Sequence, residues 1–391
     1  MPFLSGNLGF ERFSIEGFAA SQFSDEQIEL LAKNAAGNVE TASEENVHVG
    51  FLGGAHLFDQ EFDLGKNVIN DAVHVGVRID TNQIPSAIRK AWLEIELLGY
   101  AKDSPSGVPS KSQRKDAKEA VEQRCAVEAA SGKYRKMQSF PMLWDCRQNL
   151  LYFGGTAGKA SGYCIDLLEQ VFEIELRHIS AGTIAKNWAT ASDKVAEMDD
   201  CLHANFVEAC AFSSLVWDNE HSQLPDFLGN EFLLWLWWKL ENGTDSFTLA
   251  DDSEVTAMMT KTLSLECPLG ENGKETISAE FPTSLAEATE AIRSGKMPRK
   301  TGLTLIREGR QFDLVLQAET FGISGAKIHL DEEEDFDVND RIDAIRTLSD
   351  TVDMMFHVFC ECRISEQWNE DHAGIRDWLT NEPRAKQRAA A

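Results

Sequence analysis

Four cations stand out by type and by spacing: Lys111, Arg114, Lys115 and Lys118. Side chains three and four positions apart lie on one face of an α-helix, so a helix here would carry a single basic stripe. Residues 112–131 contain no proline or glycine and are rich in alanine and long, straight side chains, which favours that helix. Over the helix and the turn after it, eight cations face four acids, a local excess of +4 in an acidic chain.

A basic turn with one aromatic residue is predicted after this helix. Gly132 is typical of a helix C-terminus, and the next four residues are Lys133, Tyr134, Arg135 and Lys136. Two interpretations stay open at this point. The stretch is either a solvated helix whose charges pair with one another, or a surface that contacts successive phosphates of a nucleic acid. In the second case the Tyr134 ring is free to lie against a sugar or a base.

A second basic cluster lies in the last third of the chain. Six cations between residues 291 and 310 face one acid, Glu308, which gives an excess of +5. The cluster consists of Arg293, Lys296, Arg299, Lys300, Arg307 and Arg310. Two concentrations of cations separated by a domain's length favour a binding protein over an enzyme.

The chain as a whole is acidic. It has 391 residues and a formal net charge of −27, and this length predicts two or three domains. Hydrophobic residues make up 43% and charged residues 26%, which is typical of a soluble globular protein. The net charge argues against a general nucleic-acid coat, because the long-range field repels phosphate. DNA binding stays compatible with this charge if the cations are gathered on one inward surface.

Cysteine usage and hydropathy predict a cytoplasmic protein. The eight cysteines include no CxxC pair, and the single CxC, at 360–362, has no second pair to complete a zinc site. Reduced, buried thiols are therefore expected. No signal peptide is predicted at the start of the chain, and the most apolar run, 232–240, is far shorter than the roughly 20 residues of a membrane span. We expect no membrane partner.

The familiar catalytic motifs are missing from the sequence. It contains no glycine-rich nucleotide-binding loop, no HExxH zinc motif and no GxSxG nucleophile motif. The acidic run 331–335 is a candidate two-metal nuclease site, but consecutive acids in a strand or loop point in different directions. We therefore expect no catalytic residue, no metal site and no cofactor.

The hydrophobic pattern predicts an α+β fold with antiparallel or mixed sheets. Residues 8–15 and 72–79 alternate as strands do, whereas 85–101 and 340–363 have helical spacing. Two long helices on either side of the proline- and serine-rich loop 103–109 would form a helical projection that carries the first basic cluster near its end.

Several segments, taken in order, resemble RdgC, the recombination-associated DNA-binding protein family of bacteria. The likeness covers most of residues 1 to about 330. The segments that carry it are Gly6–Phe13, Val49–His56, Val75–Ile79, Pro85–Ala91, Lys111–Lys118, Met142–Asp145 and Gly295–Leu305. The chain departs from the family by extra sequence between about 187 and 224 and by an appended helix after 340.

The resemblance implies a protomer with a centre, a helical tip and a base. On this pattern the parts are 1–84 (centre, first part), 85–137 (tip), 138–180 (centre, second part), 181–335 (base) and 336–391 (C-terminal helix and tail). Two protomers of the family close into a ring through tip-to-tip and base-to-base contacts, with duplex DNA passing through a basic hole. Binding is largely independent of base sequence and limits the access of the RecA recombinase, which implies a place in the cytoplasm with the nucleoid.

The resemblance also implies which residues contact DNA. The expected set is Lys111, Arg114, Lys115 and Lys118 on the tip helix, Lys133, Tyr134, Arg135 and Lys136 after it, and Lys296, Arg299 and Lys300 in the base. We therefore expect a non-catalytic, homodimeric protein that binds double-stranded DNA. The alternative is an acidic interaction module that engages a recombination or replication factor without touching DNA, and a third option is a metal-dependent nuclease.

Overall fold

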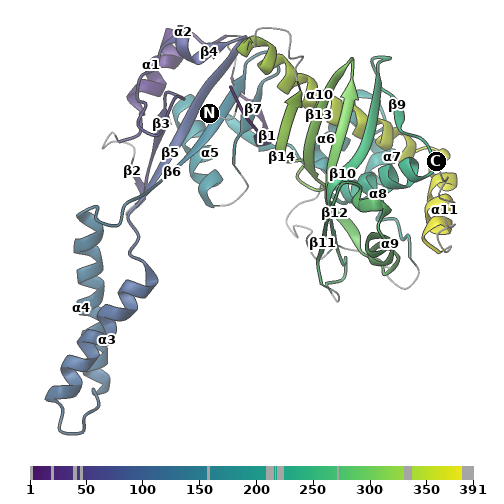
Figure 1. The fold of residues 1–391 in the computed structure, drawn as a ribbon. Helices are drawn as coiled ribbons and strands as arrows, with labels where there is room; N and C mark the ends of the chain where they lie inside the picture. The colour runs from purple at the N-terminus through teal and green to yellow at the C-terminus, as the bar shows by residue number, and fades with distance from the viewer. Residues whose placement is uncertain are drawn as a thin grey trace.

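The protein is an α+β molecule built on one large antiparallel sheet, which confirms the predicted fold class (Figure 1). The computed structural model describes residues 3–18, 22–37, 42–44, 47–155, 159–207, 215, 217, 224–270, 273–329 and 337–380. Within these ranges the helices are α1 (Asp25–Lys33), α2 (Leu64–Asn67), α3 (Ser86–Asp103), α4 (Lys111–Ala130), α5 (Lys159–Phe172), α6 (Ala181–Ala191), α7 (Val195–Asp199), α8 (Phe227–Glu241), η3 (Pro282–Ser284), α9 (Ala286–Arg293), α10 (Val338–Arg363) and α11 (Gln367–Thr380).

The described strands all belong to one 14-stranded sheet. They are β1 (Leu8–Glu16), β2 (Ala42–Glu44), β3 (Val47–Leu52), β4 (Val68–Ile69), β5 (Ala72–Thr81), β6 (Lys136–Asp145), β7 (Leu150–Phe153), β8 (Glu175–His178), β9 (Ser246–Thr248), β10 (Glu254–Glu266), β11 (Glu275–Ala279), β12 (Met297–Arg307), β13 (Arg310–Gln317) and β14 (Ile323–His329). The main path runs β11-β10-β12-β13-β14-β1-β7-β6-β5-β3-β2. Strands β1–β8 form the N-terminal sheet half and β9–β14 form the C-terminal sheet half.

Strand β1 joins the two sheet halves. Its first residues pair with β14, with Leu8 opposite Ala326 and Phe10 opposite Ile323. Its later residues pair with β7 on one edge and with β8 on the other. The residues predicted as centre and base therefore share one continuous hydrogen-bonded sheet.

Helices cover opposite faces of the two sheet halves. Along β1, Leu8 and Phe10 point into the larger hydrophobic core, whereas Phe13 and Ile15 point into the smaller one. Successive side chains on a strand alternate between faces, so the two cores lie on opposite sides of the sheet. Helices α6, α8 and α10 pack on the C-terminal half, and α1 and α5 pack on the N-terminal half (Figure 1).

Helix α10 crosses the junction between the halves (Figure 1). The stripe of Ile342, Ile345 and Leu348 is buried, as its helical spacing predicts, so α10 belongs to the core and is not an appendage. Two arginine contacts tie the junction. Arg12 of β1 hydrogen bonds to Asp353 and Ser349 of α10, and Arg346 of α10 hydrogen bonds to Asp145 of β6.

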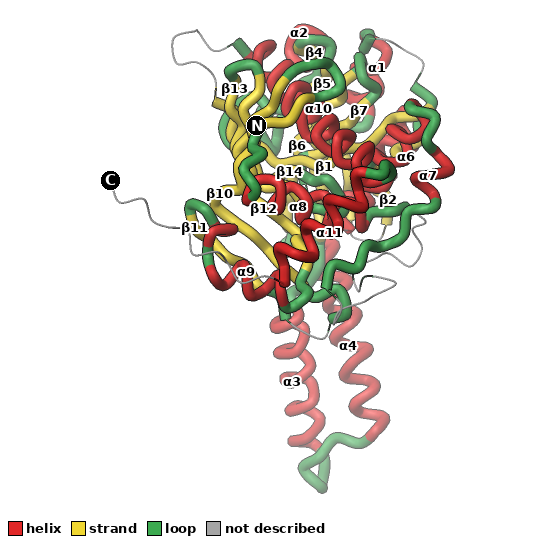
Figure 2. The backbone as a smooth tube through the Cα atoms, turned by 90° about the vertical axis from the view of Figure 1, so that its right-hand side faces the viewer, coloured by secondary structure: helices red, strands yellow, loops and turns green. Residues whose placement is uncertain are grey.

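Helices α3 and α4 form the predicted projection away from the sheet (Figures 1 and 2). Ser110 accepts a hydrogen bond from the backbone of Gln113, whose side chain accepts one from the Ser110 backbone, so a capping box starts α4. Gly132 follows the helix end with a φ of +72°, a conformation that glycine adopts without steric cost. The predicted basic turn ends earlier than expected, because Lys136 already pairs with Thr81 in the β5–β6 ladder.

Replacing Arg346 with Met should destabilise the fold by about 3–5 kcal/mol, because the Asp145 carboxylate, 1% exposed, loses its ion-pair partner and keeps only the hydrogen bond from the Arg147 backbone. Urea and thermal unfolding followed by circular dichroism measure this destabilisation. The matched control is Arg177→Met, which breaks ion pairs to Glu16 and Glu175 in which every partner is about half exposed. Water screens such pairs, so the control should change the unfolding free energy far less. Equal destabilisation in the two variants would show that α10 does not hold the sheet halves together.

Candidate nucleic-acid interface

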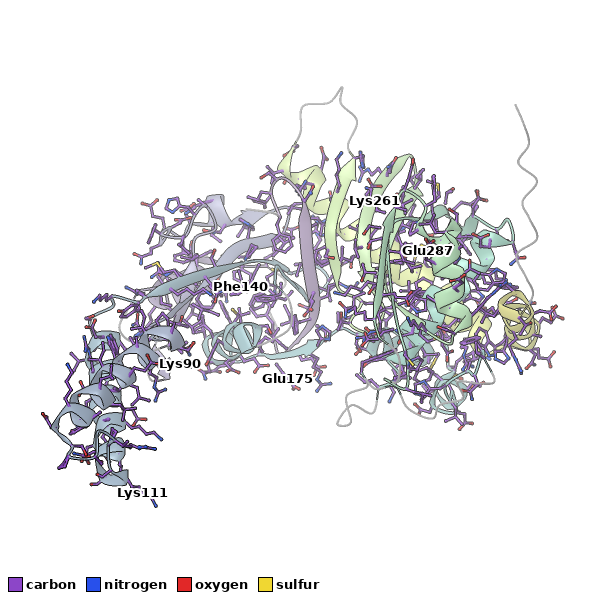
Figure 3. All side chains as sticks on the ribbon, turned by 60° about the horizontal axis from the view of Figure 1, so that its bottom comes forward. Lys90, Lys111, Phe140, Glu175, Lys261 and Glu287 are labelled. Atoms are coloured by element: carbon purple, nitrogen blue, oxygen red, sulfur yellow. The ribbon has the colours of Figure 1, made fainter. Side chains whose placement is uncertain are left out.

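The four cations of α4 are exposed along the projection. Lys111 and Lys118 form no ion pair or hydrogen bond to any side chain in the described ranges. Arg114 donates a hydrogen bond to the carbonyl of Pro109 (3.2 Å), and Lys115 lies 3.5 Å from Glu119 in an exposed pair. Figure 3 shows Lys111 near the free end of the projection and Lys90 of α3 closer to the sheet. The projection therefore presents cations to solvent along its length.

The residues after α4 have different surroundings. Lys133 pairs with Glu128 at 3.3 Å, and its ammonium lies 5.5 Å from the centre of the half-buried Tyr134 ring. Arg135 pairs with Asp80 of β5, a buried carboxylate that also binds Arg78. Arg135 thus anchors the root of the projection to the sheet. Of the four predicted residues here, Lys136 is the exposed cation for which the described chain supplies no partner.

The second basic cluster is largely neutralised inside the fold. Lys296 is 7% exposed and pairs with Glu275, while Arg299 binds Glu266 at 2.8 Å and also Glu319. Arg307 is 6% exposed and pairs with Asp251. These acids lie on other strands and loops and are distant in sequence, so the local excess of +5 does not become an exposed basic patch.

Lys300 is the member of the predicted base set that remains accessible. It lies on β12 opposite Gln317 of β13 and forms no ion pair or hydrogen bond with the residues that the structure describes. Its side chain points to the face of the C-terminal sheet half that no described helix covers. We call this surface the open face.

Two further lysines on the open face were not predicted from the sequence. Lys261 of β10 binds Asp313 of β13 at 2.7 Å, and Lys327 of β14 is exposed and sits opposite Asp313 in the ladder. His329 also contacts Asp313, at 3.2 Å. Neither lysine belongs to a basic cluster in the sequence, and only strand pairing places the two on the same face of the sheet as Lys300. A period of two in β13, with Gln311, Asp313 and Gln317 facing one way, is the sequence signal that could have indicated this face.

Asp313 is held charged by its neighbours. Partial burial alone would raise its pKa, but hydrogen bonds from Lys261, Thr304, His329 and Gln311 outweigh this effect and hold the pKa well below its ordinary value. The carboxylate therefore offsets part of the positive charge on the open face at neutral pH.

The described chain supplies no metal centre and no membrane span. No group of three or more His, Cys, Asp or Glu side chains in the described ranges is arranged to hold a metal ion. The acidic run 331–335, named as a candidate nuclease site, lies outside those ranges. None of the helices that the structure describes is both long and apolar enough to cross a membrane.

No protein-family model matches this chain, and no curated protein matches it. The resemblance to the RdgC family therefore stays a prediction that rests on its ordered segments.

Asp313→Asn should lower stability at neutral pH, and this effect should shrink as the pH falls. The folded-state pKa of Asp313 is depressed, so its stabilising effect is complete above the ordinary carboxyl pKa of 3.8 and disappears as the pH drops toward the folded-state value. Thermal midpoints of the wild type and the variant between pH 7 and about pH 2 measure the difference, with the decrease expected below pH 3.8. Asp116→Asn on the exposed face of α4 is the control and should show little change. A gap between the wild type and Asp313→Asn that stayed constant with pH would contradict the assignment.

Proposed function

We propose that this protein is a non-catalytic, double-stranded DNA-binding protein of the RdgC type that acts as a homodimer. Residues 86–136 carry eleven cations and seven acids, in a chain whose net charge is −27. The observation that carries the proposal is the set of exposed lysines on and beside the projection for which the described chain supplies no partner. They are Lys90, Lys102, Lys111, Lys118 and Lys136.

The charge distribution restricts where DNA can bind. Because the rest of the molecule is strongly acidic, its field repels phosphate from most of the surface and favours the projection and the lysines of the open face. Lysine is a point charge on a flexible stem, which suits phosphate contacts better than bidentate recognition of base edges. This supports binding that is largely independent of base sequence.

The proposed role follows from where such binding would occur. A ring of two copies around duplex DNA would coat it without chemistry and limit access of a RecA-type recombinase, as the RdgC resemblance implies. Such a protein would lie in the cytoplasm with the nucleoid. It would need no cofactor.

Lys111→Gln combined with Lys118→Gln should weaken binding to duplexes of any sequence by a similar factor. The slope of log K against log salt should become shallower by about 0.9 for each phosphate that the variant no longer neutralises. Fluorescence anisotropy on several unrelated duplexes, at a series of salt concentrations, measures both quantities. Lys194→Gln removes an exposed lysine at the start of α7, away from the projection, and should leave the slope unchanged. Absence of wild-type binding at low salt, or weakening confined to one duplex, would refute the proposal.

Exposed apolar side chains on the projection support self-association. Ile95 and Leu98 of α3 are 60% and 62% exposed and, three positions apart, share a helix face. Val108 and Val127, also on the projection, are 54% and 70% exposed. The projection buries few side chains of its own, Trp92 of α3 among them. Apolar groups gathered on a small two-helix hairpin are typical of a contact surface, and a tip-to-tip contact between two copies would cover them.

Leu98→Asp should convert a dimer into a monomer, because the contact would then have to bury an unpaired carboxylate. Light scattering behind size-exclusion chromatography gives the mass at several concentrations. Leu202→Asp is the matched control, since Leu202 is 80% exposed but lies outside the projection. A wild-type chain that stays monomeric at every concentration with and without DNA would remove the dimer from the proposal, as would an unchanged mass in Leu98→Asp.

The same apolar surface also fits the alternative function, an acidic module that engages a recombination or replication factor. The two functions differ in one measurable respect. The module would bind its protein partner through its acidic exterior, with Ile95 and Leu98 as a further contact, and would show no salt-dependent affinity for duplex DNA.

A further inference from the structure

A pocket of about 270 Å³ lies at the seam between the two sheet halves. Its walls come from β1 and from Gly154 and Gly155 after β7 on one side, and from β12, β13 and the start of β14 on the other. Figure 1 shows β1, β7 and β14 side by side at this seam, as the strand pairing requires. A second pocket, beside Phe206 and Leu379, has only about 10 Å³, enough for a water molecule. The seam pocket is close to the lower end of the roughly 300–1,000 Å³ range of small-molecule sites.

Two opposite charges line the seam pocket without pairing with each other. Lys300 forms no ion pair or hydrogen bond within the described ranges. Glu11 of β1 has a side chain that is 10% exposed, and His178 approaches its carboxylate at 3.6 Å. The ammonium and the carboxylate reach the pocket from different sheet halves, so their separation depends on the pairing of β12, β13, β14 and β1 in that order.

Neutral polar groups and bare backbone complete the walls. Gln317 and the hydroxyls of Thr320 and Ser324 can donate or accept hydrogen bonds. Glycine at position 322 keeps the wall beside Glu11 thin, because a Cβ there would stand 3.3 Å from Glu11 Cγ and 3.1 Å from Thr320 Oγ1. These features leave room for a small polar molecule next to both charges.

The pair of charges decides the class of ligand. A purely anionic ligand, such as a phosphate of DNA or a dicarboxylate, would bind Lys300 but would place like charge beside Glu11. A purely cationic ligand would bind Glu11 but would place its positive charge beside the ammonium of Lys300. A ligand with one anionic and one cationic group places opposite charge beside each of the two side chains at once, and hydrogen bonds to charged groups are the strong ones.

We propose that the seam pocket binds a small zwitterion of the α-amino-acid class, with the ligand carboxylate at Lys300 and the ligand ammonium at Glu11. The bound molecule bridges the two sheet halves and neutralises Lys300 on the open face. This inference rests on the geometry of the pocket and not on DNA binding.

The test uses the full chain and measures ligand binding directly. Each proteinogenic α-amino acid is added separately at millimolar concentration, and the thermal midpoint and calorimetric heat are recorded. Succinate supplies two anionic groups, 1,4-diaminobutane supplies two cationic groups and glycerol supplies none. We expect one amino acid, or a chemically related subset, to raise the midpoint and release heat. The three other probes should do neither, and N-acetylation or amidation of the best amino acid should abolish its effect.

Two variants test whether Lys300 and Glu11 bind the charged groups of the ligand. Lys300→Met and Glu11→Gln should each weaken binding by about tenfold or more, as expected for removal of a charged hydrogen bond. Lys327→Met removes a lysine of the open face outside the pocket lining and should bind as the wild type does. If Glu11→Gln does not fold, Lys300→Met and the acetylated and amidated ligands still decide the question. The proposal is overturned if no amino acid binds, if succinate or diaminobutane binds equally well, or if Lys300→Met retains full affinity.

Discussion

The two arginine–aspartate contacts between α10 and the sheet are the interaction on which the rest of the molecule depends. The two sheet halves have their cores on opposite faces, so no common hydrophobic layer holds them together. The seam is therefore held by the strand pairing of β1 and by the side chains that cross it to α10. Arg12 and Arg346 cross it as buried guanidinium groups that bind Asp353 and Asp145. Such pairs add little net stability compared with apolar packing, but removing one partner is costly, so they specify a single arrangement of the halves.

That arrangement produces both the open face and the seam pocket. Because helices change faces at the seam, the C-terminal sheet half is left with a face that none of the described helices covers. The pocket beside Lys300 and Glu11 lies where the two halves meet. Had α6, α8 and α10 packed on the side of the sheet that α1 and α5 cover, Lys261, Lys300 and Lys327 would lie beneath a helical layer. The topology of the sheet thus decides which lysines a ligand can reach.

Charge is distributed by the same packing. Acids from separate strands and loops neutralise Lys296, Arg299 and Arg307, whereas α4 has few tertiary neighbours and keeps its cations in water. Few residues from the rest of the chain pack against the two-helix projection, so few acids from elsewhere can pair with its cations. Its local excess of positive charge therefore remains after folding. This physical difference separates the two basic clusters, although their compositions look alike in the sequence.

Periodicity and local signals in the sequence determined most of the elements. The helix-forming stretch 112–131, Gly132 and the loop 103–109 predict the α3–α4 projection, and alternation predicts β1 and β5, because those signals act over a few residues. Helices α6 and α11 were not predicted from the sequence, and both pack against α8. The sequence alone could not place cations relative to acids hundreds of residues away, nor reveal the lysines of the open face. Those features depend on long-range strand pairing and on which face each helix covers, and only the tertiary structure decides them.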